Sequence, residues 1–182
     1  MERLFRSLWG PFTALGLGIA ALACAADQAL KLWLLFVFKL AERGVVAVGP
    51  FVELVLTWNT GISYGWFQQE TPLGQWLLLA FKALAVGLLW VWMARAGSRS
   101  SALALGLIIG GAFGNAIDRL AYGAVADFVL FHIETATWRF NWYVFNLADV
   151  AIVAGVAVLL YESLLGGTPQ KRPDPTDTAE PR

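Results

Sequence analysis

The stretch ALALGLIIGGAFGNAIDRLAYGAVADF (residues 102–128) holds a long apolar run that ends in a cluster of polar side chains. Its uncharged part, residues 102–117, approaches the roughly 20 apolar residues that an α-helix needs to cross a bilayer core. Gly106, Gly110 and Gly114 recur every four residues and form a stripe that permits close approach of another helix. The stretch therefore predicts a membrane-spanning helix with polar groups at one end.

Three further apolar runs surround this one, at residues 12–38, 73–93 and about 146–165. Each is near the length of a membrane span. The first run continues well past Cys24, which makes it too long for the apolar region of a cleaved signal peptide. The whole chain of 182 residues is 58% hydrophobic and 14% charged, whereas soluble domains carry about 25% charged residues. We therefore expect a membrane all-α protein with four transmembrane helices and a small β element.

The distribution of basic residues predicts the orientation of these spans. Four spans place both chain ends on one side, and cytoplasmic segments carry the excess of Lys and Arg. The side of the termini would carry seven basic residues, Arg3, Arg6, Arg95, Arg99, Lys171, Arg172 and Arg182. The other side would carry four, Lys39, Arg43, Arg119 and Arg139. We expect both termini in the cytoplasm and residues 39–72 and 118–145 on the outer side of the membrane.

The segments between the spans differ in character. Residues 44–67 are rich in Val and aromatic residues and are punctuated by Gly and Pro, which predicts short strands in a small outer sheet. Residues 128–142 mix aromatic and polar side chains, and periodicity leaves an interfacial helix and a loop as alternatives. We expect one integral membrane domain over 1–167, with an outer β-rich segment at about 40–70, and a disordered cytoplasmic tail over 168–182.

The counts of charged, Cys and His residues limit the possible functions. Basic and acidic residues number 13 each, so the net charge gives no information about a nucleic-acid or acidic partner. We expect no nucleic-acid partner. Cys24 and His132 are the only residues of their types, which excludes an intrachain disulfide and any site with several histidines. His132 with Glu134 would make a poor metal site, and we favour an interfacial histidine. We expect neither a metal nor another cofactor.

Charged residues inside the predicted spans are functional candidates, because charges are costly in a bilayer. Asp27 and Lys31 are four residues apart and share a helix face. They could form a structural ion pair that neutralises itself, or they could order a nearby site. Asn115, Asp118 and Arg119 share a face at the outer end of the 102–117 helix, where a plain helix end would not require all three.

Two further aspartates lie near the outer face in this prediction. Asp127 follows the break at Gly123, and Asp149 falls in the first turn of a helix that Asn146 would cap. Asp149 alone could be only a capping group. If the two carboxylates meet, however, they cannot both ionise easily, and one keeps a proton. One could then act as a base on a water while the other acts as an acid during amide hydrolysis, as in aspartic proteases.

A carrier that binds ions or protons through the same carboxylates is one alternative, and a scaffold without chemistry is another. A carrier would hold its acidic groups near the bilayer midplane, between broken helices. Asp127 and Asp149 are instead predicted at helix ends. A scaffold would leave the polar clusters unexplained.

Four motifs in order resemble the signal peptidase II (lipoprotein signal peptidase) family. They are DQALK (27–31), WNTGISYG (58–65), GNAIDRLAYGAVADF (114–128) and FNLAD (145–149). The resemblance covers about residues 20–165. Tyr64 stands where the family usually has Phe, and Ile62 and Ser63 replace a commoner small pair, which weakens the match of the second motif only.

The resemblance implies an aspartic endopeptidase with four transmembrane helices and an extracytoplasmic β-cradle. It implies removal of signal peptides from diacylglyceryl-modified prolipoproteins, with cleavage just before the lipid-bearing cysteine. By the motifs, Asp127 and Asp149 are the catalytic pair. Positions that match substrate-binding or supporting residues are Asn59, Gly61, Asn115, Arg119 and Asn146, with Asp27, Lys31 and Asp118 in less defined roles. We expect lipidated prolipoproteins and membrane lipids as partners, and a monomer.

Overall fold

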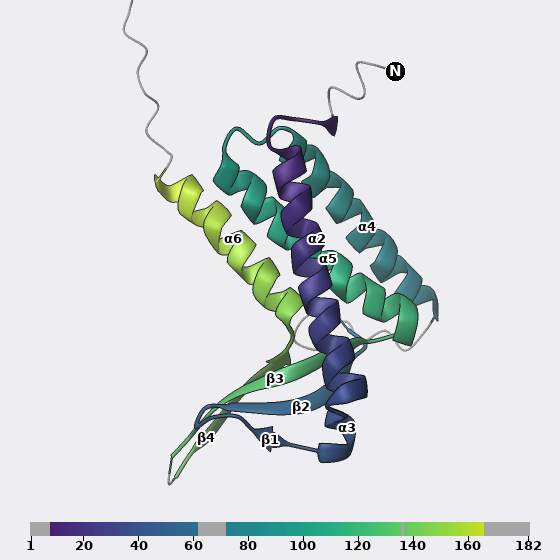
Figure 1. Cartoon of the computed structure of the whole chain (residues 1–182), viewed down its shortest axis with the longest axis vertical. Coiled ribbons are helices and arrows are strands. Elements are labelled where there is room, and N and C mark those ends of the chain that lie inside the picture. The colour runs from purple at the N-terminus through teal and green to yellow at the C-terminus, as the bar shows by residue number, and fades with distance from the viewer. Residues whose placement is uncertain (1–7, 62–71, 136, 166–182) are drawn as a thin grey trace, which may run out of the picture.

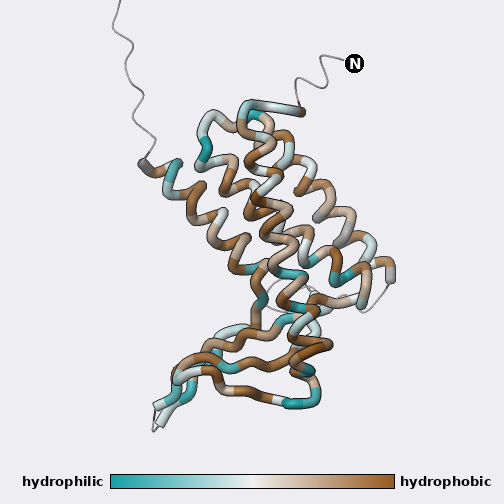
Figure 2. The backbone as a smooth tube through the Cα atoms, in the orientation of Figure 1, coloured by the Kyte–Doolittle hydropathy of each residue, from teal (hydrophilic) through white to brown (hydrophobic). Residues whose placement is uncertain are grey.

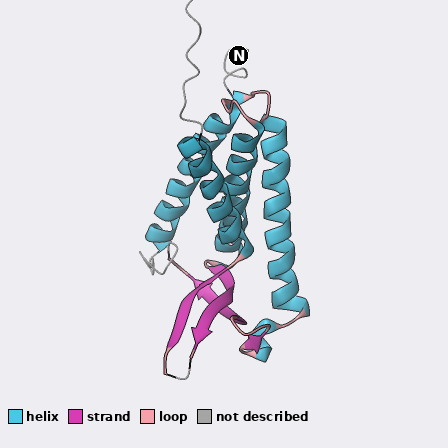
Figure 3. Ribbon diagram, turned by 90° about the vertical axis from the view of Figure 1, so that its left-hand side faces the viewer, coloured by secondary structure: helices cyan, strands magenta, loops and turns pink. Residues whose placement is uncertain are grey.

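A computed structural model of the chain describes residues 8–61, 72–135 and 137–165 (Figure 1). Its helices are α2 (Thr13–Leu32), which continues into a π-helix η1 (Trp33–Val37), α3 (Leu40–Arg43), α4 (Pro72–Ala94), α5 (Arg99–Tyr122) and α6 (Leu147–Leu165). Its strands are β1 (Val46–Ala47), β2 (Val52–Asn59), β3 (Val125–Glu134) and β4 (Arg139–Phe145). The helices form a bundle, and the sheet lies at one end of it (Figure 3).

The four predicted spans correspond to α2 with η1, α4, α5 and α6. Within the described residues, the segments Thr13–Val37, Arg99–Tyr122 and Leu147–Leu164 are long and apolar enough to cross a membrane, and Ala83–Ala94 is a shorter apolar segment of α4. The whole of α4 has 23 residues, which gives a length of about 34 Å against a bilayer core of roughly 30 Å. Apolar residues dominate the bundle (Figure 2).

Glycines in α5 allow the helices to pack closely, as the sequence predicted. A Cβ atom added to Gly106 or Gly110 would collide with backbone carbonyl groups of α2. A Cβ atom added to Gly111 would collide with the carbonyl of Ala148 at the start of α6, and Gly155 of α6 approaches the carbonyl of Ala104 in the same way. The central helix α5 therefore contacts α2 on one side and α6 on the other through positions where only glycine fits.

The sheet is antiparallel, with the order β1-β2-β3-β4. The predicted strands in 44–67 are confirmed as β1 and β2, while residues 62–67 lie outside the described part of the chain. The prediction of an interfacial helix or a loop over 128–142 is wrong, because this region forms most of the hairpin β3–β4. Half of the sheet thus lies outside the expected 40–70 segment.

A small apolar core fixes the sheet to the end of the bundle. Phe128 of β3 is buried together with Leu34 of η1 and Leu40 of α3. The residue just before Phe128 is Asp127, so this contact also sets the position of that carboxylate. The starts of α2 and α6 lie at opposite ends of the bundle, so that the described N-terminal and C-terminal ends both lie away from the sheet (Figure 1).

Candidate active site

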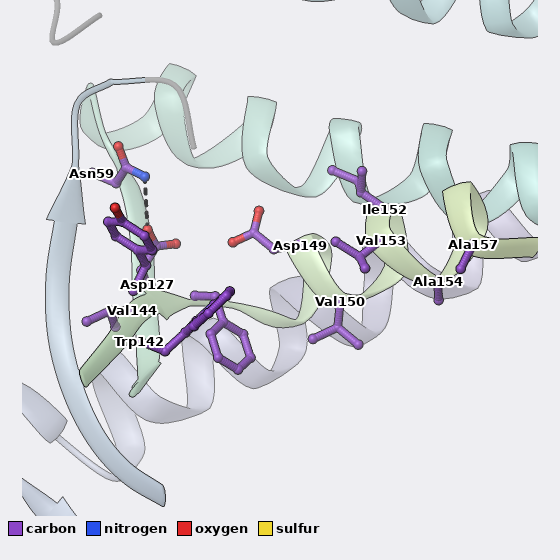
Figure 4. Close-up of a pocket in the computed structure, with 12 residues that line it drawn as sticks. Asn59, Asp127, Trp142, Val144, Asp149, Val150, Ile152, Val153, Ala154 and Ala157 are labelled. Carbon is purple, nitrogen blue, oxygen red and sulfur yellow. Dashed lines mark hydrogen bonds between the residues drawn. The ribbon is translucent and has the colours of Figure 1, made fainter. Parts of the chain in front are cut away.

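Asp127 and Asp149 line one cavity of about 510 Å³ at the junction of the sheet and the bundle (Figure 4). Asp127 comes from β3 and Asp149 from the first turn of α6. The remaining lining residues are Asn59, Trp142, Tyr143, Val144, Phe145, Val150, Ile152, Val153, Ala154 and Ala157. Two carboxylates that are 22 positions apart in the sequence thus line the same largely apolar pocket.

Asn146 caps α6 and also connects the two aspartates. Its side-chain oxygen accepts a hydrogen bond of 3.0 Å from the backbone amide of Asp149. The Asp149 carboxylate accepts the backbone amide of Asn146 in return, at 3.2 Å. This reciprocal arrangement is a capping box. The Asn146 amide group then donates to the Asp127 carboxylate at 2.6 Å, so one buried side chain positions both acids.

Asp127 is buried, and it accepts a second hydrogen bond of 3.1 Å from the side chain of Asn59. Burial is the main cause that raises the pKa of Asp127, to about 6, and the charge of Asp149 acts in the same direction. The hydrogen bonds from Asn59 and Asn146 lower this pKa and offset part of the rise. Asp127 therefore stays mostly protonated up to a pH of about 6.

Asn115 of α5 connects this pair to a buried lysine. Its amide group donates to the Asp149 carboxylate at 2.9 Å. Its oxygen accepts one hydrogen bond from the Asn146 side chain at 3.0 Å and another from Lys31 at 3.1 Å. The Asn115 and Asn146 side chains each use both ends of the amide, which fixes their orientation.

Asp27, Lys31 and Asp118 form a buried charged cluster behind the cavity. The Lys31 ammonium lies 2.8 Å from Asp27 and 2.8 Å from Asp118. Asp27 also accepts the backbone amide of Ala148 at 2.9 Å. Both readings of the Asp27–Lys31 pair therefore hold, because the pair is neutralised internally and also orders the neighbouring site.

Each of the two carboxylates in this cluster accepts a hydrogen bond from the backbone amide of the residue just before a cavity aspartate. Asp27 binds the amide of Ala148, the residue before Asp149. Asp118 binds the amide of Ala126 at 3.1 Å, and Ala126 is the residue before Asp127. The buried cluster therefore fixes the backbone of β3 next to Asp127 and the backbone of α6 next to Asp149.

Arg119 and Gly61 meet beside the cavity at the end of β2. The Arg119 guanidinium donates to the carbonyl of Gly61 and, at 3.4 Å, to that of Thr60. The backbone amide of Gly61 donates to the Asn59 side chain at 3.0 Å. Arg119 thus secures the turn that presents Asn59 to Asp127. Ile62, Ser63 and Tyr64, where the motif departs from the family pattern, lie outside the described residues.

Sequence reasoning missed two features of the site. Gln28 donates to Asp118 at 2.8 Å and to the carbonyl of Gly114 at 3.0 Å, so it joins α2 to α5. The sequence offered one indication of this role, because Gln28 is a polar residue next to Asp27 inside an apolar run. Trp142 and Tyr143 form a wall of the cavity, at an irregularity in the β3–β4 register between Leu130 and His132. Such bulges redirect side chains next to active sites.

His132 and Cys24 lie away from the cavity lining. His132 is buried in the sheet, with Nε2 at 3.6 Å from the Glu53 carboxylate. The neighbour of the histidine is therefore Glu53 of β2 and not the Glu134 considered from the sequence. Cys24 is a free, half-buried cysteine of α2.

The site residues inferred from the sequence thus come together in three dimensions. The arrangement offers two carboxylates on one cavity, one of them with a raised pKa, and each is held by fixed amide donors. Such a pair can supply a general base and a general acid to a bound water and an amide. The apolar stretch of α6 that continues from Asp149 can accommodate an apolar part of a substrate.

Comparisons with known proteins show the family of the chain. The family model described as "Signal peptidase (SPase) II" matches residues 19–165. A protein named "Lipoprotein signal peptidase" from Rhodopseudomonas palustris (strain TIE-1) is 62% identical over 159 residues, which cover 87% of this chain and 97% of that protein. A protein of the same name from Nitrobacter hamburgensis is 63% identical over 158 residues, with coverages of 87% and 96%.

Solved structures share the fold. One, titled as a bacterial membrane enzyme structure, matches with a TM-score of 0.70 at 22% identity and covers 88% of this chain and 93% of its own. A second structure of the same description has a TM-score of 0.69 at 22% identity, with coverages of 88% and 99%. The match of the family model over most of the chain and the identity to these relatives establish that the chain belongs to the signal peptidase II family.

Proposed function

We propose that Asp127 and Asp149 are the catalytic pair of a membrane aspartic endopeptidase that removes signal peptides from diacylglyceryl-modified prolipoproteins. The substrate follows from membership of the family and from the name of its relatives. The observation that carries the assignment of the residues is the Asn146 side chain, which contacts both aspartates at the edge of one cavity.

The reaction requires one proton between the two carboxylates. Asp127, with its pKa raised to about 6, is the group that keeps this proton. Asp149 lies in the first turn of α6, where its carboxyl group accepts a hydrogen bond of 3.2 Å from the backbone amide of Asn146. In the proposed mechanism, ionised Asp149 takes a proton from a water bound between the two groups. The water oxygen attacks the amide carbon that precedes the lipid-bearing cysteine.

The protonated partner completes the cycle. Asp127 donates a hydrogen bond to the developing oxyanion, and a proton then passes to the leaving nitrogen as the C–N bond breaks. The products are the free signal peptide, with a new carboxylate, and the lipoprotein, with a free amine on its lipidated cysteine. The two carboxyl groups titrate as a coupled pair. We assign the roles of acid and base to Asp127 and Asp149 from the environment of each group.

The surrounding residues have supporting roles in this proposal. Asn115 and Asn146 orient the two carboxylates, and Asn59 holds Asp127 from the side of β2. Arg119 and Gly61 shape the substrate-facing turn. The remaining members of the buried cluster, Asp27, Lys31 and Asp118, set the backbone positions of the catalytic segments.

We further propose that the protein is a monomer in the bacterial inner membrane, with both termini in the cytoplasm and the cavity near the outer face. The basic residues near the termini support this orientation. The location of the cavity at the end of the bundle supports a peptidase over a carrier, which would bind at the midplane. Residues 1–167 then form the peptidase domain, and the tail over 168–182 lies outside the described residues.

Membrane lipids are proposed as neighbours of the cavity. The side chains of Val150 and Val153 are exposed on the face of α6 that continues from Asp149. A diacylglyceryl group anchors a substrate at the membrane surface. A cavity at that depth can receive the substrate by lateral diffusion, with apolar residues of α6 next to its acyl chains.

The test is cleavage of a lipidated prolipoprotein by the purified protein and by Asp127→Asn and Asp149→Asn variants. Both substitutions preserve shape and remove a carboxylate, and each is expected to abolish detectable cleavage. Glu134→Gln, which removes an exposed carboxylate of β3 outside the cavity, serves as the control and should cleave normally. Retained activity in either aspartate variant would refute the role given to that residue.

A further inference from the structure

The hairpin β3–β4 has two chemically different faces. Along β4 and the residue just before it, Trp138, Phe140 and Trp142 alternate with Arg139 and Asn141. The rings of Trp138 and Phe140 have centroids 5.7 Å apart, and those of Phe140 and Trp142 are 5.9 Å apart. Since successive side chains of a strand point to opposite faces, these three rings form one continuous aromatic row.

The neighbouring strands extend this aromatic row. Ile133 of β3 is paired with Phe140, and Phe131 lies two residues before Ile133, on the same face of the strand. The ring of Phe131 lies 6.4 Å from that of Phe51, which precedes β2. We call the set Phe51, Phe131, Ile133, Trp138, Phe140 and Trp142 the aromatic face of the hairpin.

The opposite face is polar, and its charged side chains lie close to one another. Arg139 lies 3.2 Å from the Glu53 carboxylate and 3.5 Å from that of Glu134. It also donates to Asn141 at 3.0 Å, and His132 approaches Glu53. Beyond Phe131, the charges of the outer part of the hairpin thus gather on the face opposite the aromatic row.

The aromatic face is open in the described structure. Trp138 is 55% exposed, Trp142 47% and Phe51 50%. In a water-soluble antiparallel sheet, the apolar face packs on a core and the polar face meets solvent. Here the polar face is present, but the described residues provide no element that covers the aromatic one. An apolar surface of this kind marks an interaction site.

Two observations indicate what covers this face. Trp142 lines the cavity together with Val150 and Val153 of α6, whose side chains are 46% and 65% exposed on a membrane-spanning helix. β4 also passes into α6 through the single residue Asn146. The hairpin extends sideways from the end of the bundle at this junction (Figure 1). The aromatic row therefore begins where the lipid-facing surface of α6 ends.

We propose that the aromatic face of the β3–β4 hairpin rests in the interfacial zone of the bilayer leaflet next to the sheet. Trp side chains favour this zone because the apolar ring can contact lipid while the polar N–H forms a hydrogen bond with headgroups or water. The charged face, with Arg139 and Glu134, then points to water. This docking holds the mouth of the cavity at the level of the lipid headgroups. It requires only that α6 spans the membrane and does not depend on the catalytic roles of the aspartates.

Spin labels on neighbouring residues of opposite faces test the proposal. Cys24 is the only cysteine, so a Cys24→Ala background accepts one new cysteine at a time. Ile133→Cys and Trp138→Cys place labels on the aromatic face, and Glu134→Cys and Arg139→Cys place matched labels on the polar face. The full-length protein is reconstituted into phosphatidylglycerol–phosphatidylcholine nanodiscs. Collision of each label with oxygen, which partitions into lipid, is compared with collision with a water-soluble nickel chelate.

The expected pattern alternates along the chain. Labels at 133 and 138 collide preferentially with oxygen, and labels at 134 and 139 collide preferentially with the nickel chelate. Preference for the chelate at all four positions overturns the proposal, because the hairpin would then stand in water. Protection of 133 and 138 from both reagents, with spin–spin broadening, overturns it in favour of contact between two copies of the chain.

An activity measurement separates this proposal from the proposed function. Trp138 lies outside the cavity lining, so Trp138→Ser should leave kcat unchanged. Its apparent KM for a lipidated prolipoprotein is expected to rise several-fold in nanodiscs but not in detergent micelles, where no bilayer surface is present. Equal KM values for wild type and variant in nanodiscs contradict the docking. Loss of activity in the Asp127→Asn variant with an intact label pattern leaves both proposals standing.

Discussion

The side-chain nitrogen Nδ2 of Asn146 lies 2.6 Å from Oδ1 of Asp127, across the gap between the start of α6 and the middle of the sheet. The same residue caps α6 through the backbone amide of Asp149. A single fully buried side chain therefore stabilises a helix and sets the distance between two acids. The proposed mechanism therefore couples stability and catalysis at Asn146, and substitutions can separate the two.

Asn146→Ala is expected to reduce both properties. Loss of the cap costs about 0.5–2 kcal/mol of stability. Loss of the donor to Asp127 displaces a reacting group, and a shift of about 1 Å can cost roughly 10²-fold in rate. Asn146→Ser retains an oxygen that can cap the helix but has no amide to reach Asp127. We expect it to recover most of the thermal stability and little of kcat. Recovery of both would contradict the positioning role.

The stability of the fold is expected to depend on pH through Asp127. Its pKa is raised by burial to about 6, from an unfolded value of about 4. Between these values the folded protein binds more protons than the unfolded chain, so this stabilisation is complete below about pH 4 and is lost as the pH rises through 6. The loss is on the order of 3 kcal/mol. Thermal unfolding in detergent over pH 4–7 measures it.

Asp127→Asn is the matched control for this pH dependence, because an amide of the same shape does not titrate. The variant should unfold at a nearly constant temperature between pH 4 and 6. Above pH 6 it should be more stable than the wild type. Parallel pH curves for the two proteins would show that another group is responsible for the slope.

Catalytic activity should decrease on the alkaline side of the same pKa. The proposed mechanism needs one proton on the pair, and ionisation of Asp127 near pH 6 removes it. We therefore expect kcat/KM to fall, with the slope of a single ionisation, as the pH rises above about 6. Steady-state cleavage of a lipidated peptide whose own groups do not titrate in this range measures the profile. A constant kcat/KM from pH 5 to 8 contradicts the shared proton.

Much of this architecture could be predicted from local patterns. The four apolar runs are long enough to be recognised by length alone, and the Gly106–Gly110–Gly114 stripe correctly indicated close helix packing. Asn146 before an apolar run correctly predicted the start of α6, with Asp149 in its first turn. These features depend on residues that are near one another in sequence, where spacing is sufficient.

The remaining features depend on contacts that spacing does not encode. Residues 128–131 form a continuous apolar run, which does not distinguish a strand from other buried segments. Residues 138–142 alternate between aromatic and polar side chains, and this alternation indicates a strand only when Trp138 and Arg139 are assigned to opposite faces. Asp27 and Lys31 were recognisable as neighbours on one helix, but the second partner, Asp118, lies 87 residues after Lys31 along the chain. Only the packing of α2 on α5 brings the two together.

Lys31 is expected to be essential for stability because it neutralises two buried carboxylates. Lys31→Met leaves both without a cation, and breaking a buried pair in this way costs about 3–5 kcal/mol. The combined variant Lys31→Met, Asp27→Asn, Asp118→Asn removes all three charges and retains oxygens that accept the amides of Ala148 and Ala126. Its melting temperature should exceed that of Lys31→Met alone.

The exposed Lys39 provides the control for this prediction. Lys39 lies 3.6 Å from Glu42, with 59% of its side chain exposed. Surface pairs contribute at most about 1 kcal/mol, so Lys39→Met should change the melting temperature little. Similar losses for Lys31→Met and Lys39→Met would mean that the charge of Lys31 has no special structural role.

Helix packing provides the last prediction, through two glycines in different surroundings. A Cβ at Gly110 of α5 would meet the backbone of Ala20 in α2, which cannot move away as a flexible side chain can. Gly110→Ala should therefore destabilise the bundle by about 1–3 kcal/mol. Gly18 of α2 has no neighbour within 4 Å of an added Cβ. Gly18→Ala should be neutral or slightly stabilising, since Ala favours a helix over Gly. Thermal unfolding of both variants measures the difference, and equal losses would contradict close packing at Gly110.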